Sequence, residues 1–586
     1  TCMEKFAEVY ANLNTAQRQA VDTIYGPVLV IAGPGTGKTQ LLSARVAHIL
    51  QVTDTLPQNI LCLTFTENGA LNMRERLTKF IGPHAYDVQI GTYHAFGRTV
   101  IGRFPEYFTE LRLERPVDEL GKRQILSHII DEVDYRSPIK QVRHHLGDLV
   151  STISEVKRGL FTPEGLRKVA LDNLGVIEKT ADTIGGVLAP YAARMPSKLD
   201  VAEPLFRQIH DVLLATASRS PDNAGKYDSL AVTAADALSI ALEEAASEGK
   251  TSKLTGWKNK WLVKNKQNEF VLAGALESAR IAALADVLEA YQAALQAQGL
   301  YDFDDMILRA IEVLENNDEL RFTLQEQYQF ILLDEFQDTN AAQLKLVELL
   351  TNNPVHEGQP NVLAVGDDDQ AIYAFQGAQY SNMLDFYTMY RDTAVIALSE
   401  NYRSNEPILQ TAAAVAAQIE SRLHSHMSGI NKVLIPKAKE VEQPALERKE
   451  YLSDIAELDG VANEVKSLIG KGIIPGEIAI LAPKHRYLEP LVAYLQKQGV
   501  PVAYEKRENI LESISVRQLL TMSKLVSALH AGHHGTANSL WPEVLSYDFW
   551  GFSVADIWRS SWQANDTKKS WSEVLLEQPQ FKHAAL

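Results

Sequence analysis

The stretch "VLVIAGPGTGKTQLL", residues 28–42, decides the fold of the region around it. Its apolar start, 28–32, predicts a short buried strand, and the pattern from residue 40 onward predicts an amphipathic helix. The turn between them is a Walker A sequence with alanine at its first position: Ala32, Gly33, Pro34, Gly35, Thr36, Gly37, Lys38 and Thr39. Its glycines let backbone N–H groups converge on phosphates, and the helix start adds a positive dipole end. We therefore predict a P-loop in which Lys38 reaches the β- and γ-phosphates and Thr39 binds Mg²⁺.

An acidic pair later in the chain supplies the second half of a nucleotide site. The segment "FILLDEFQDTN", residues 330–340, begins as an apolar strand and reaches Asp334 and Glu335 where that strand ends. In P-loop enzymes a carboxylate holds Mg²⁺, and a neighbouring group positions the attacking water. We therefore predict that Asp334 binds Mg²⁺ and that Glu335 orients and deprotonates water.

Length, charge and cysteine content limit the class of protein. A chain of 586 residues is too long for one hydrophobic core, which predicts several domains. The net charge of −17 does not exclude a nucleic-acid partner, because a local cleft can still gather basic groups. No apolar run is long enough to span a bilayer, and Cys2 and Cys62 indicate neither a disulfide framework nor a four-thiolate metal site. These features predict a cytoplasmic protein with no membrane partner.

Seven segments in a fixed order narrow the choice of enzyme. They are "LNTAQRQAV" (13–21), "ILCLTFTENGALNMRERL" (60–77), "IGTYHAFGR" (90–98), "YDFDDMI" (301–307), "DEFQDTN" (334–340), "VGDDDQAIYAFQGA" (365–378) and "LSENYRSNEPI" (398–408). Together they resemble the UvrD/Rep/PcrA group of superfamily 1 DNA helicases. The resemblance implies an α/β fold: a P-loop RecA-like motor lobe with a large helical insertion, then an incomplete second RecA-like lobe.

The same resemblance implies a division of the chain. Residues 1–104 and 300–396 form the first RecA-like ATPase lobe, and 105–299 form an inserted helical subdomain. Residues 397–529 form part of a second RecA-like lobe, and 530–586 begin a second inserted subdomain. Within 397–529 the pattern predicts buried strands in "EIAILAPKH" (477–485) and after Gly499.

The resemblance also assigns roles around ATP. Gln17 reads the adenine edge, Tyr402 stacks on adenine, and Gln370 links the γ-phosphate to the DNA-binding loops. Arg403 meets the γ-phosphate, where a planar, permanently charged guanidinium suits the charge that spreads over the transferring group. The implied catalytic residues are Lys38, Glu335, Gln370 and Arg403. The implied ATP-binding residues are Gln17, the loop 32–40 that ends at Gln40, Tyr402 and Arg403.

A second set of residues matches positions that face single-stranded DNA in the family. These are Thr64, Phe65, His94, Tyr373 and Phe375. Aromatic faces stack on any base, at roughly 1–3 kcal/mol per base, which suits a motor that walks along any sequence. For the neighbouring Tyr93 and Phe96, packing in the core is the alternative.

Three departures from the family pattern each remove a cation near phosphates. Glu67 and Asn68 stand where a basic residue usually follows "TFT", Gln376 replaces the arginine before "GA", and Gln40 replaces a frequent arginine after Lys-Thr. The catalytic acid pair is intact. These changes bear on DNA affinity or coupling, not on nucleotide binding.

The stretch "KTSKLTGWKNKWLVKNK", residues 250–266, is rich in lysine and contains no acidic residue. Trp257 and Trp261 lie four residues apart on one helical face. We predict that this patch grips DNA, with Lys258 and Lys260 on the backbone and Trp257 as a stacking platform. The alternative is a solvated face whose tryptophans pack on the neighbouring helix.

The resemblance predicts a DNA helicase or translocase driven by ATP and Mg²⁺. It would act on single-stranded DNA and single-strand/duplex junctions, in the 3′ to 5′ direction, in repair, recombination or replication restart. The family's two later motifs, "T-x-H-x-x-K-G-L-E" and "V-A-x-T-R-A", are not found in 404–586. We therefore expect an N-terminal fragment that hydrolyses ATP poorly alone. The alternatives are the helicase part of a helicase–nuclease and a naturally short, non-catalytic, ATP-gated DNA-binding module.

Overall fold

The computed structural model describes most of the chain. The described residues are 2–108, 115–140, 146–217, 229–372, 381–419, 422–423, 431–438, 446–504, 510 and 513–581. They fall into two compact units, Thr1–Leu446 and Glu447–Leu586, and each is described by itself. None of the described helices is long and apolar enough to cross a membrane.

The first unit is built on a six-stranded parallel sheet with the strand order β10-β1-β9-β8-β2-β3. The strands are β1 (Val28–Ala32), β2 (Ile60–Thr64), β3 (Gln89–Thr92), β8 (Phe330–Leu333), β9 (Val362–Gly366) and β10 (Ala394–Leu398). All five pairings are parallel, so the carboxyl ends of the strands meet at one edge. In open parallel sheets this edge is where ligands bind. The topology confirms the predicted α/β class.

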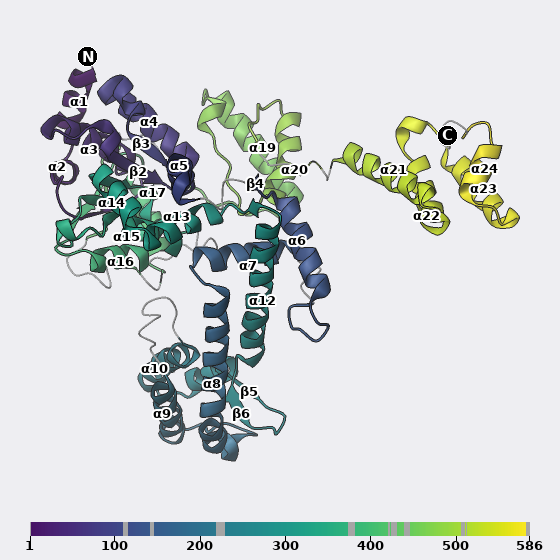
Figure 1. The fold of residues 1–586 in the computed structure, drawn as a ribbon, viewed down its shortest axis with the longest axis horizontal. Coiled ribbons are helices and arrows are strands. Elements are labelled where there is room, and N and C mark those ends of the chain that lie inside the picture. Colours follow the sequence, from purple (N-terminus) through teal and green to yellow (C-terminus); the bar gives the residue numbers. More distant parts are fainter. Residues whose placement is uncertain are drawn as a thin grey trace. The chain divides into compact units, whose positions relative to one another are not determined.

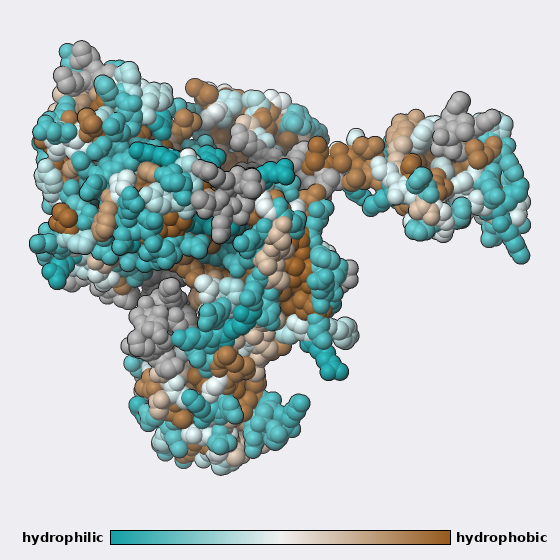
Figure 2. Space-filling model, in the orientation of Figure 1, coloured by the Kyte–Doolittle hydropathy of each residue, from teal (hydrophilic) through white to brown (hydrophobic). Residues whose placement is uncertain are grey.

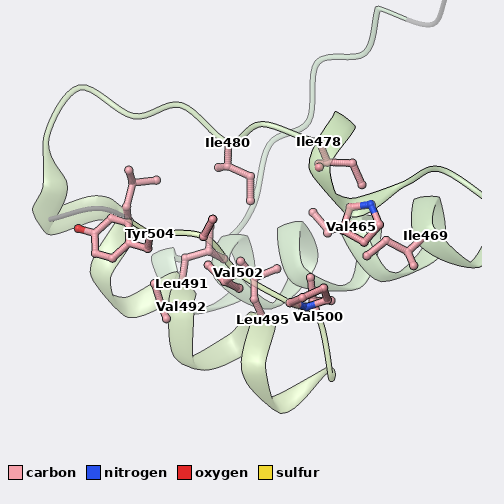
Figure 3. Close-up of a pocket in the computed structure, with 15 residues that line it drawn as sticks. Val465, Ile469, Ile478, Ile480, Leu491, Val492, Leu495, Val500, Val502 and Tyr504 are labelled. Atoms are coloured by element: carbon pink, nitrogen blue, oxygen red, sulfur yellow. The ribbon is translucent and has the colours of Figure 1, made fainter. Parts of the chain in front are cut away.

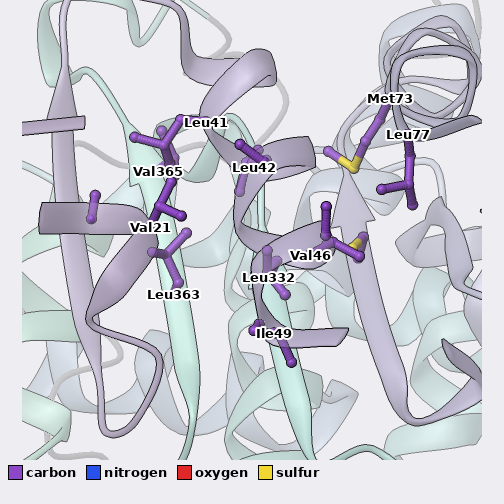
Figure 4. Packing of buried hydrophobic residues seen from close by; sticks show 14 of the residues in the cluster. Val21, Leu41, Leu42, Val46, Ile49, Met73, Leu77, Leu332, Leu363 and Val365 are labelled. Atoms are coloured by element: carbon purple, nitrogen blue, oxygen red, sulfur yellow. The ribbon is translucent and has the colours of Figure 1, made fainter. Parts of the chain in front are cut away.

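Successive residues of β1 point to opposite faces of the sheet and enter two separate cores. Val28 and Val30 belong to one core, and Leu29 and Ile31 belong to the other. The first core is covered by α1 (Cys2–Ala11), α2 (Thr15–Asp22), α3 (Lys38–Val52) and α4 (Glu67–Ile81). In Figure 4 the leucine and valine side chains of α3 interdigitate with those of β8 and β9. The five residues of β1 are all buried, as expected for a strand covered on both faces.

The opposite face of the sheet carries a second group of helices. They are α5 (Tyr93–Arg103), α13 (Asp305–Asn316), α14 (Asp318–Gln327), α15 (Ala341–Thr351) and α16 (Ser381–Met389). Tyr93 and Phe96, both 1% exposed, lie in this core. Core packing is therefore the correct interpretation of these two aromatic residues.

A helical region is inserted between α5 and α13. Its helices are α6 (Glu119–Glu132), α7 (Leu146–Arg158), α8 (Pro163–Leu188), α9 (Leu199–Thr216), α10 (Leu230–Glu248), α11 (Ser252–Trp261) and α12 (Ala275–Ala297). The long helices α8 and α12 pack side by side (Figure 1). Two short parallel strands, β4 (Arg115–Pro116) and β7 (Leu300–Tyr301), pair near the ends of the insertion. An antiparallel hairpin of β5 (Leu262–Lys264) and β6 (Phe270–Leu272) follows α11.

The first unit continues past the sheet. The short strand β11 (Glu400–Asn401) pairs in parallel with β12 (Ile435–Pro436), and α17 (Glu406–Ala416) lies between them in sequence. These segments are important for the site described below because they pass over the end of β1.

The described part of the second unit is helical. Its helices are α19 (Asp454–Gly470), α20 (His485–Lys497), α21 (Ile514–His530), α22 (His534–Leu545), α23 (Val554–Thr567) and α24 (Trp571–Glu577). Only one face of α21 enters the core: Leu525 and Ala528 are buried, whereas Ile514 and Val526 are largely exposed. Hydrophobic residues gather on the surface at the start of this helix (Figure 2).

The strands expected in 477–485 and after Gly499 are wrong for the described residues. Ile478, Ile480, Val500 and Val502 instead line an apolar pocket of about 490 Å³ beside α19 and α20 (Figure 3). An alternating apolar pattern becomes a strand only when a neighbouring strand supplies partners for its backbone N–H and C=O groups. The described residues of this unit contain no such strand.

Candidate functional site

The predicted phosphate loop joins β1 to α3 at the carboxyl edge of the sheet. Gly35 and Gly37 have φ values of +69° and +86°, in the left-handed region that favours glycine. A Cβ added to Gly35 would lie 2.6 Å from the Asn401 side-chain nitrogen and 2.7 Å from the Arg403 Cβ. The loop therefore needs glycine both for its backbone shape and for the close approach of the 401–403 segment.

An ion pair links the two predicted halves of the site. The Lys38 Nζ lies 2.7 Å from the Glu335 Oε2, and the Gln337 side-chain amide donates to the same oxygen at 2.9 Å. Burial would raise the pKa of Glu335, but the charge of Lys38 and these hydrogen bonds outweigh it and hold the pKa below its usual value. Glu335 is therefore ionised at neutral pH, as a general base must be.

Two further carboxylates lie next to this pair. Burial and the charge of Glu335 raise the pKa of Asp334 to about 6, and the same two causes raise the pKa of Asp338 to about 6. The Asp338 Oδ1 is buried and has no hydrogen-bond partner in the described structure. Carboxylate oxygens suit a hard divalent cation, and the Thr39 hydroxyl group stands in the first turn of α3, directly after the phosphate loop. By their chemistry, Thr39 and Asp334 suit the Mg²⁺ site predicted from the sequence, and the unpaired Asp338 oxygen is a further candidate ligand.

Gln337 extends the ion pair to the end of the neighbouring strand β9. Its side-chain oxygen accepts from the Asp367 backbone N–H at 3.0 Å, and the Asp367 Oδ2 accepts from the Gln370 side chain at 2.7 Å. A continuous set of contacts therefore runs from Lys38 through Glu335, Gln337 and Asp367 to Gln370. We call this set the Lys38–Gln370 chain.

The segment around β11 contacts the phosphate loop from the other side. The buried Asn401 donates from its side chain to the Pro34 carbonyl group, and the Tyr402 backbone N–H donates to the Gly35 carbonyl at 2.9 Å. The Asn401 Oδ1 accepts from the Arg403 backbone N–H at 2.9 Å, and this hydrogen bond holds the backbone of Arg403 in place. Sequence reasoning missed Asn401, although it stands next to the predicted Tyr402.

The four predicted catalytic residues converge on one small cavity of about 160 Å³. It is lined by Pro34, Gly35, Gly37, Lys38, Thr39, Arg76, Glu335, Gln370 and Arg403. Arg76, on α4, was not predicted, because its own segment carries no phosphate-binding pattern. Ala32 ends β1, and Gly33 and Thr36 lie in the loop that follows, where the Thr36 hydroxyl donates to the Gly33 carbonyl at 2.7 Å. Gln40 lies in the first turn of α3.

Of the two residues predicted to meet adenine, Gln17 lies in the first turn of α2 and Tyr402 follows β11. Gln17 is buried, and its amide nitrogen donates to the Thr36 carbonyl at 2.9 Å. Asn14 and Gln17 form a capping box at the helix start, and the Asn14 side chain also donates to the Tyr402 hydroxyl at 3.0 Å. The Tyr402 hydroxyl in turn donates to Glu400 at 2.6 Å. The structure therefore brings Gln17 and Tyr402 together through Asn14.

The residues predicted to face DNA follow the next two strands. Thr64 ends β2 and is buried, Phe65 follows it, and His94 lies in the first turn of α5, after β3. The predicted DNA contacts Tyr373 and Phe375, and the departure at Gln376, lie outside the described residues. Glu67, which stands where a cation is usual, accepts from the Thr92 hydroxyl at 2.9 Å and lies in the first turn of α4, where a carboxylate is favourable.

The prediction that Trp257 is a stacking platform is wrong. Its side chain is 4% exposed, its ring nitrogen donates to the Ala234 carbonyl at 3.1 Å, and its ring meets Phe206 edge to face. The four-residue spacing of the two tryptophans is compatible with a buried or an exposed helix face. In the structure Trp257 packs in the core formed with α9 and α10. Lys258 and Lys264 lie over the ring of Phe270, at 4.9 Å and 5.3 Å from its centroid.

A buried ion cluster joins the helical insertion to the segment "YDFDDMI". The Lys157 Nζ, 1% exposed, contacts Asp302 and lies 2.8 Å from the Asp305 Oδ1, and Arg158 binds Asp304 at 2.9 Å. Phe303, between these acids, stacks on His94 with ring centroids 3.9 Å apart. The predicted DNA residue His94 is therefore held by the junction at the end of α7.

The sequence is similar to known helicase domains. A family model described as the UvrD/REP helicase N-terminal domain matches residues 13–391, and one described as the UvrD-like helicase C-terminal domain matches 396–531. The chain is 25% identical over 529 residues to the ATP-dependent DNA helicase PcrA of Staphylococcus epidermidis, covering 88% of this chain and 54% of the relative. It is 27% identical over 424 residues to the PcrA of Bacillus subtilis strain 168, covering 71% and 41%.

The chain thus spans about half the length of the curated relatives that it matches. The second family match does not support the expectation of an N-terminal fragment that lacks the last helicase motifs, since sequence of the C-terminal domain is present.

The junction at His94 gives a prediction about pH. Burial lowers the pKa of His94 from 6.5 to about 4; the Asp304 carboxylate opposes this shift, and the Arg158 charge adds to it. On acidification, His94 of the unfolded chain takes up its proton at a higher pH than His94 of the folded chain. The free energy of unfolding is therefore unaffected by this residue above pH 6.5 and decreases as the pH falls from 6.5 toward 4. Between pH 7 and pH 5 this loss is about 1–2 kcal/mol.

Urea denaturation of the wild type and His94→Gln at both pH values measures this contribution. We expect the wild type to lose more stability on acidification than the variant. An equal loss in both proteins would contradict the buried, neutral state of His94.

Proposed function

Because the chain belongs to the UvrD/REP helicase family, we propose that it is an ATP-dependent DNA helicase or translocase acting on single-stranded DNA. The observation that carries the proposal is the small cavity in which Lys38, Glu335, Gln370 and Arg403 meet at the carboxyl edge of the sheet. A strand–loop–helix with an ion-paired carboxylate on a nearby strand is what phosphoryl transfer requires. Relatives named ATP-dependent DNA helicase support this function.

The side chains of the cavity have distinct roles in the proposed hydrolysis. The ionised Glu335 orients a water molecule and takes its proton, while Lys38 and the loop N–H groups bind the β- and γ-phosphates. Arg403 enters from the segment after β11 and meets the charge that develops on the transferred phosphoryl group. Thr39 and Asp334, with Asp338 beside them, would hold Mg²⁺, which supplies further neutralisation of phosphate charge.

We propose that DNA is bound at the edge next to this cavity. Phe65 follows β2, which pairs with β8, and His94 follows β3, which pairs with β2. Aromatic faces bind bases without regard to sequence. Gln370 would carry the signal between ATP and DNA through the loop that begins at Asp367. Movement from 3′ to 5′, action at single-strand/duplex junctions and a role in repair, recombination or replication restart are parts of this proposal that rest on family resemblance.

The domain division is also part of the proposal. Residues 1–104 and 300–396 would act as the ATPase lobe and 105–299 as its helical insertion. Residues 397–529 would belong to the second lobe and 530–586 to a second insertion. Strands β1 to β3 and β8 to β10, which come from both parts of the proposed ATPase lobe, support this division.

Replacing Glu335 with glutamine tests the catalytic assignment. The change keeps the size of the side chain and its contact with Lys38 but removes the charge that accepts a proton. We expect phosphate release in the presence of oligo(dT) to fall by about 100-fold or more, whereas binding of a fluorescent ATP analogue persists. Glu348→Gln, on α15 away from the cavity, is the control. Hydrolysis by Glu335→Gln at the wild-type rate would show that Glu335 is not the base.

Removing the lysines at the hairpin tests the proposed contact of the insertion with DNA. Lys258, Lys260 and Lys264 lie on α11 and β5, and we propose that they bind the phosphate backbone. The triple alanine variant should bind a single-strand/duplex junction more weakly, with a salt dependence flatter by about two in log–log slope.

Lys253→Ala is the matched control, because the Lys253 ammonium group is already engaged by Glu244 at 2.9 Å and by Glu248. Binding by the triple variant with unchanged affinity and slope would remove the hairpin from the DNA interface.

A further inference from the structure

Lys432 is a nearly buried lysine that no sequence pattern singled out. Its side chain is 9% exposed and lies among three consecutive carboxylates at the end of β9. The Nζ is 3.2 Å from the Asp367 Oδ1, 2.5 Å from the Asp368 Oδ1 and 3.0 Å from the Asp369 Oδ2. One cation thus contacts all three acids, from a segment more than 60 residues away in the chain.

The three carboxylates cannot stay close together without such a partner. Their ligand atoms all lie within 4.8 Å of one another, and the side chains of Asp367 and Asp368 are almost fully buried. Arg422 binds Asp369 through two contacts, and the Leu423 N–H donates to the Asp368 Oδ2 at 2.7 Å. A divalent cation could balance the same charges, but the Lys432 ammonium group already stands between them. Removing one partner of a buried ion pair leaves an uncompensated charge.

Asp367 connects Lys432 to the proposed catalytic cavity. Its Oδ2 accepts from the Gln370 side chain at 2.7 Å, and its N–H donates to the Gln337 Oε1 at 3.0 Å. Gln370 lines the cavity together with Lys38 and Glu335. Lys432 is therefore connected to Gln370 through a single residue, Asp367. Its ammonium group holds the Asp367 carboxylate, and that carboxylate orients the Gln370 side chain at the cavity.

The residues next to Lys432 contact two other parts of the same site. The Leu434 side chain lies 2.8 Å from where a Cβ on Gly33 would be, so it rests on the phosphate loop. The Ile435 N–H donates to the Ser399 carbonyl and the Lys437 N–H to the Asn401 carbonyl, each at 2.7 Å. The segment 432–437 thus contacts the loop at Asp367, the phosphate loop and the strand that precedes Arg403.

We propose that Lys432 is a positioning residue for ATP hydrolysis: by holding Asp367, it keeps Gln370 in the phosphate cavity and fixes the segment 432–437 against the site. This inference rests on the proposed ATPase function. Lys432 does not contact ATP in this proposal. Its loss should therefore lower the turnover of ATP and leave the affinity for the nucleotide unchanged.

The kinetic test uses Lys432→Met, which keeps the length of the side chain and removes its charge. We expect kcat for oligo(dT)-stimulated ATP hydrolysis to fall about tenfold while KM for ATP changes less than about twofold, since a misplaced catalytic group costs turnover. Lys432→Arg restores the charge and should recover part of kcat. Lys5→Met, an exposed lysine on α1 of the same unit, should behave as wild type.

A second readout does not depend on activity. Hydrogen exchange of the full chain, followed by mass spectrometry, should show faster exchange at residues 367–370 in Lys432→Met and unchanged exchange in α3. Faster exchange throughout the first unit would show a general structural role and overturn the inference. Wild-type exchange at 367–370 with wild-type kcat would also overturn it and leave the proposed function standing. Absence of oligo(dT)-stimulated hydrolysis in the wild type would count against the proposed function, and the exchange data would still decide the role of Lys432.

Discussion

The ion pair between Lys38 and Glu335 is the interaction on which the rest of the site depends. Each of the two groups is partly removed from water and would be costly to keep charged without the other. The pair is possible because β1 and β8 are separated in the sheet by one strand, β9, so that their carboxyl ends lie on either side of Gly366 and Asp367. Gln337 contacts both sides at once, with Glu335 on its nitrogen and the Asp367 N–H on its oxygen.

The strand order therefore explains why an ATP site and a proposed DNA site are neighbours. The sheet places β9 between the two halves of the ATP site, and the loop after β9 carries Gln370. Strands β8, β2 and β3 follow in order, so Phe65 and His94 extend the same edge. The segments of 400–403 and 432–437 then contact this edge from outside, through Asn401, Leu434 and Lys432.

The sequence predicted the parts of the molecule that local pattern determines. The strand–loop–helix around Lys38 and the strand that ends at Asp334 were found because their apolar runs, glycines and acids are contiguous. Trp257 was misjudged because helical spacing does not say which face of α11 is buried. The strands expected near Ile480 and Val502 failed because a strand depends on partners that its own sequence does not contain. Lys432 was missed because it acts through contacts with distant segments, which leave no local signal. Asn401 was missed although it lies inside a recognised motif, because its role is a contact with the distant phosphate loop.

We propose that the Lys38–Gln370 chain couples the proposed ATP cavity to the proposed DNA-binding edge. Coupling of two binding sites is reciprocal, so it can be measured as a change in DNA affinity on nucleotide binding. The direct measurement is the affinity for oligo(dT), by fluorescence anisotropy, with and without a non-hydrolysable ATP analogue and Mg²⁺. We expect the affinity to change by about fivefold or more in the wild type, and not in Lys38→Ala. An oligo(dT) affinity that is the same with and without a saturating analogue would contradict the account.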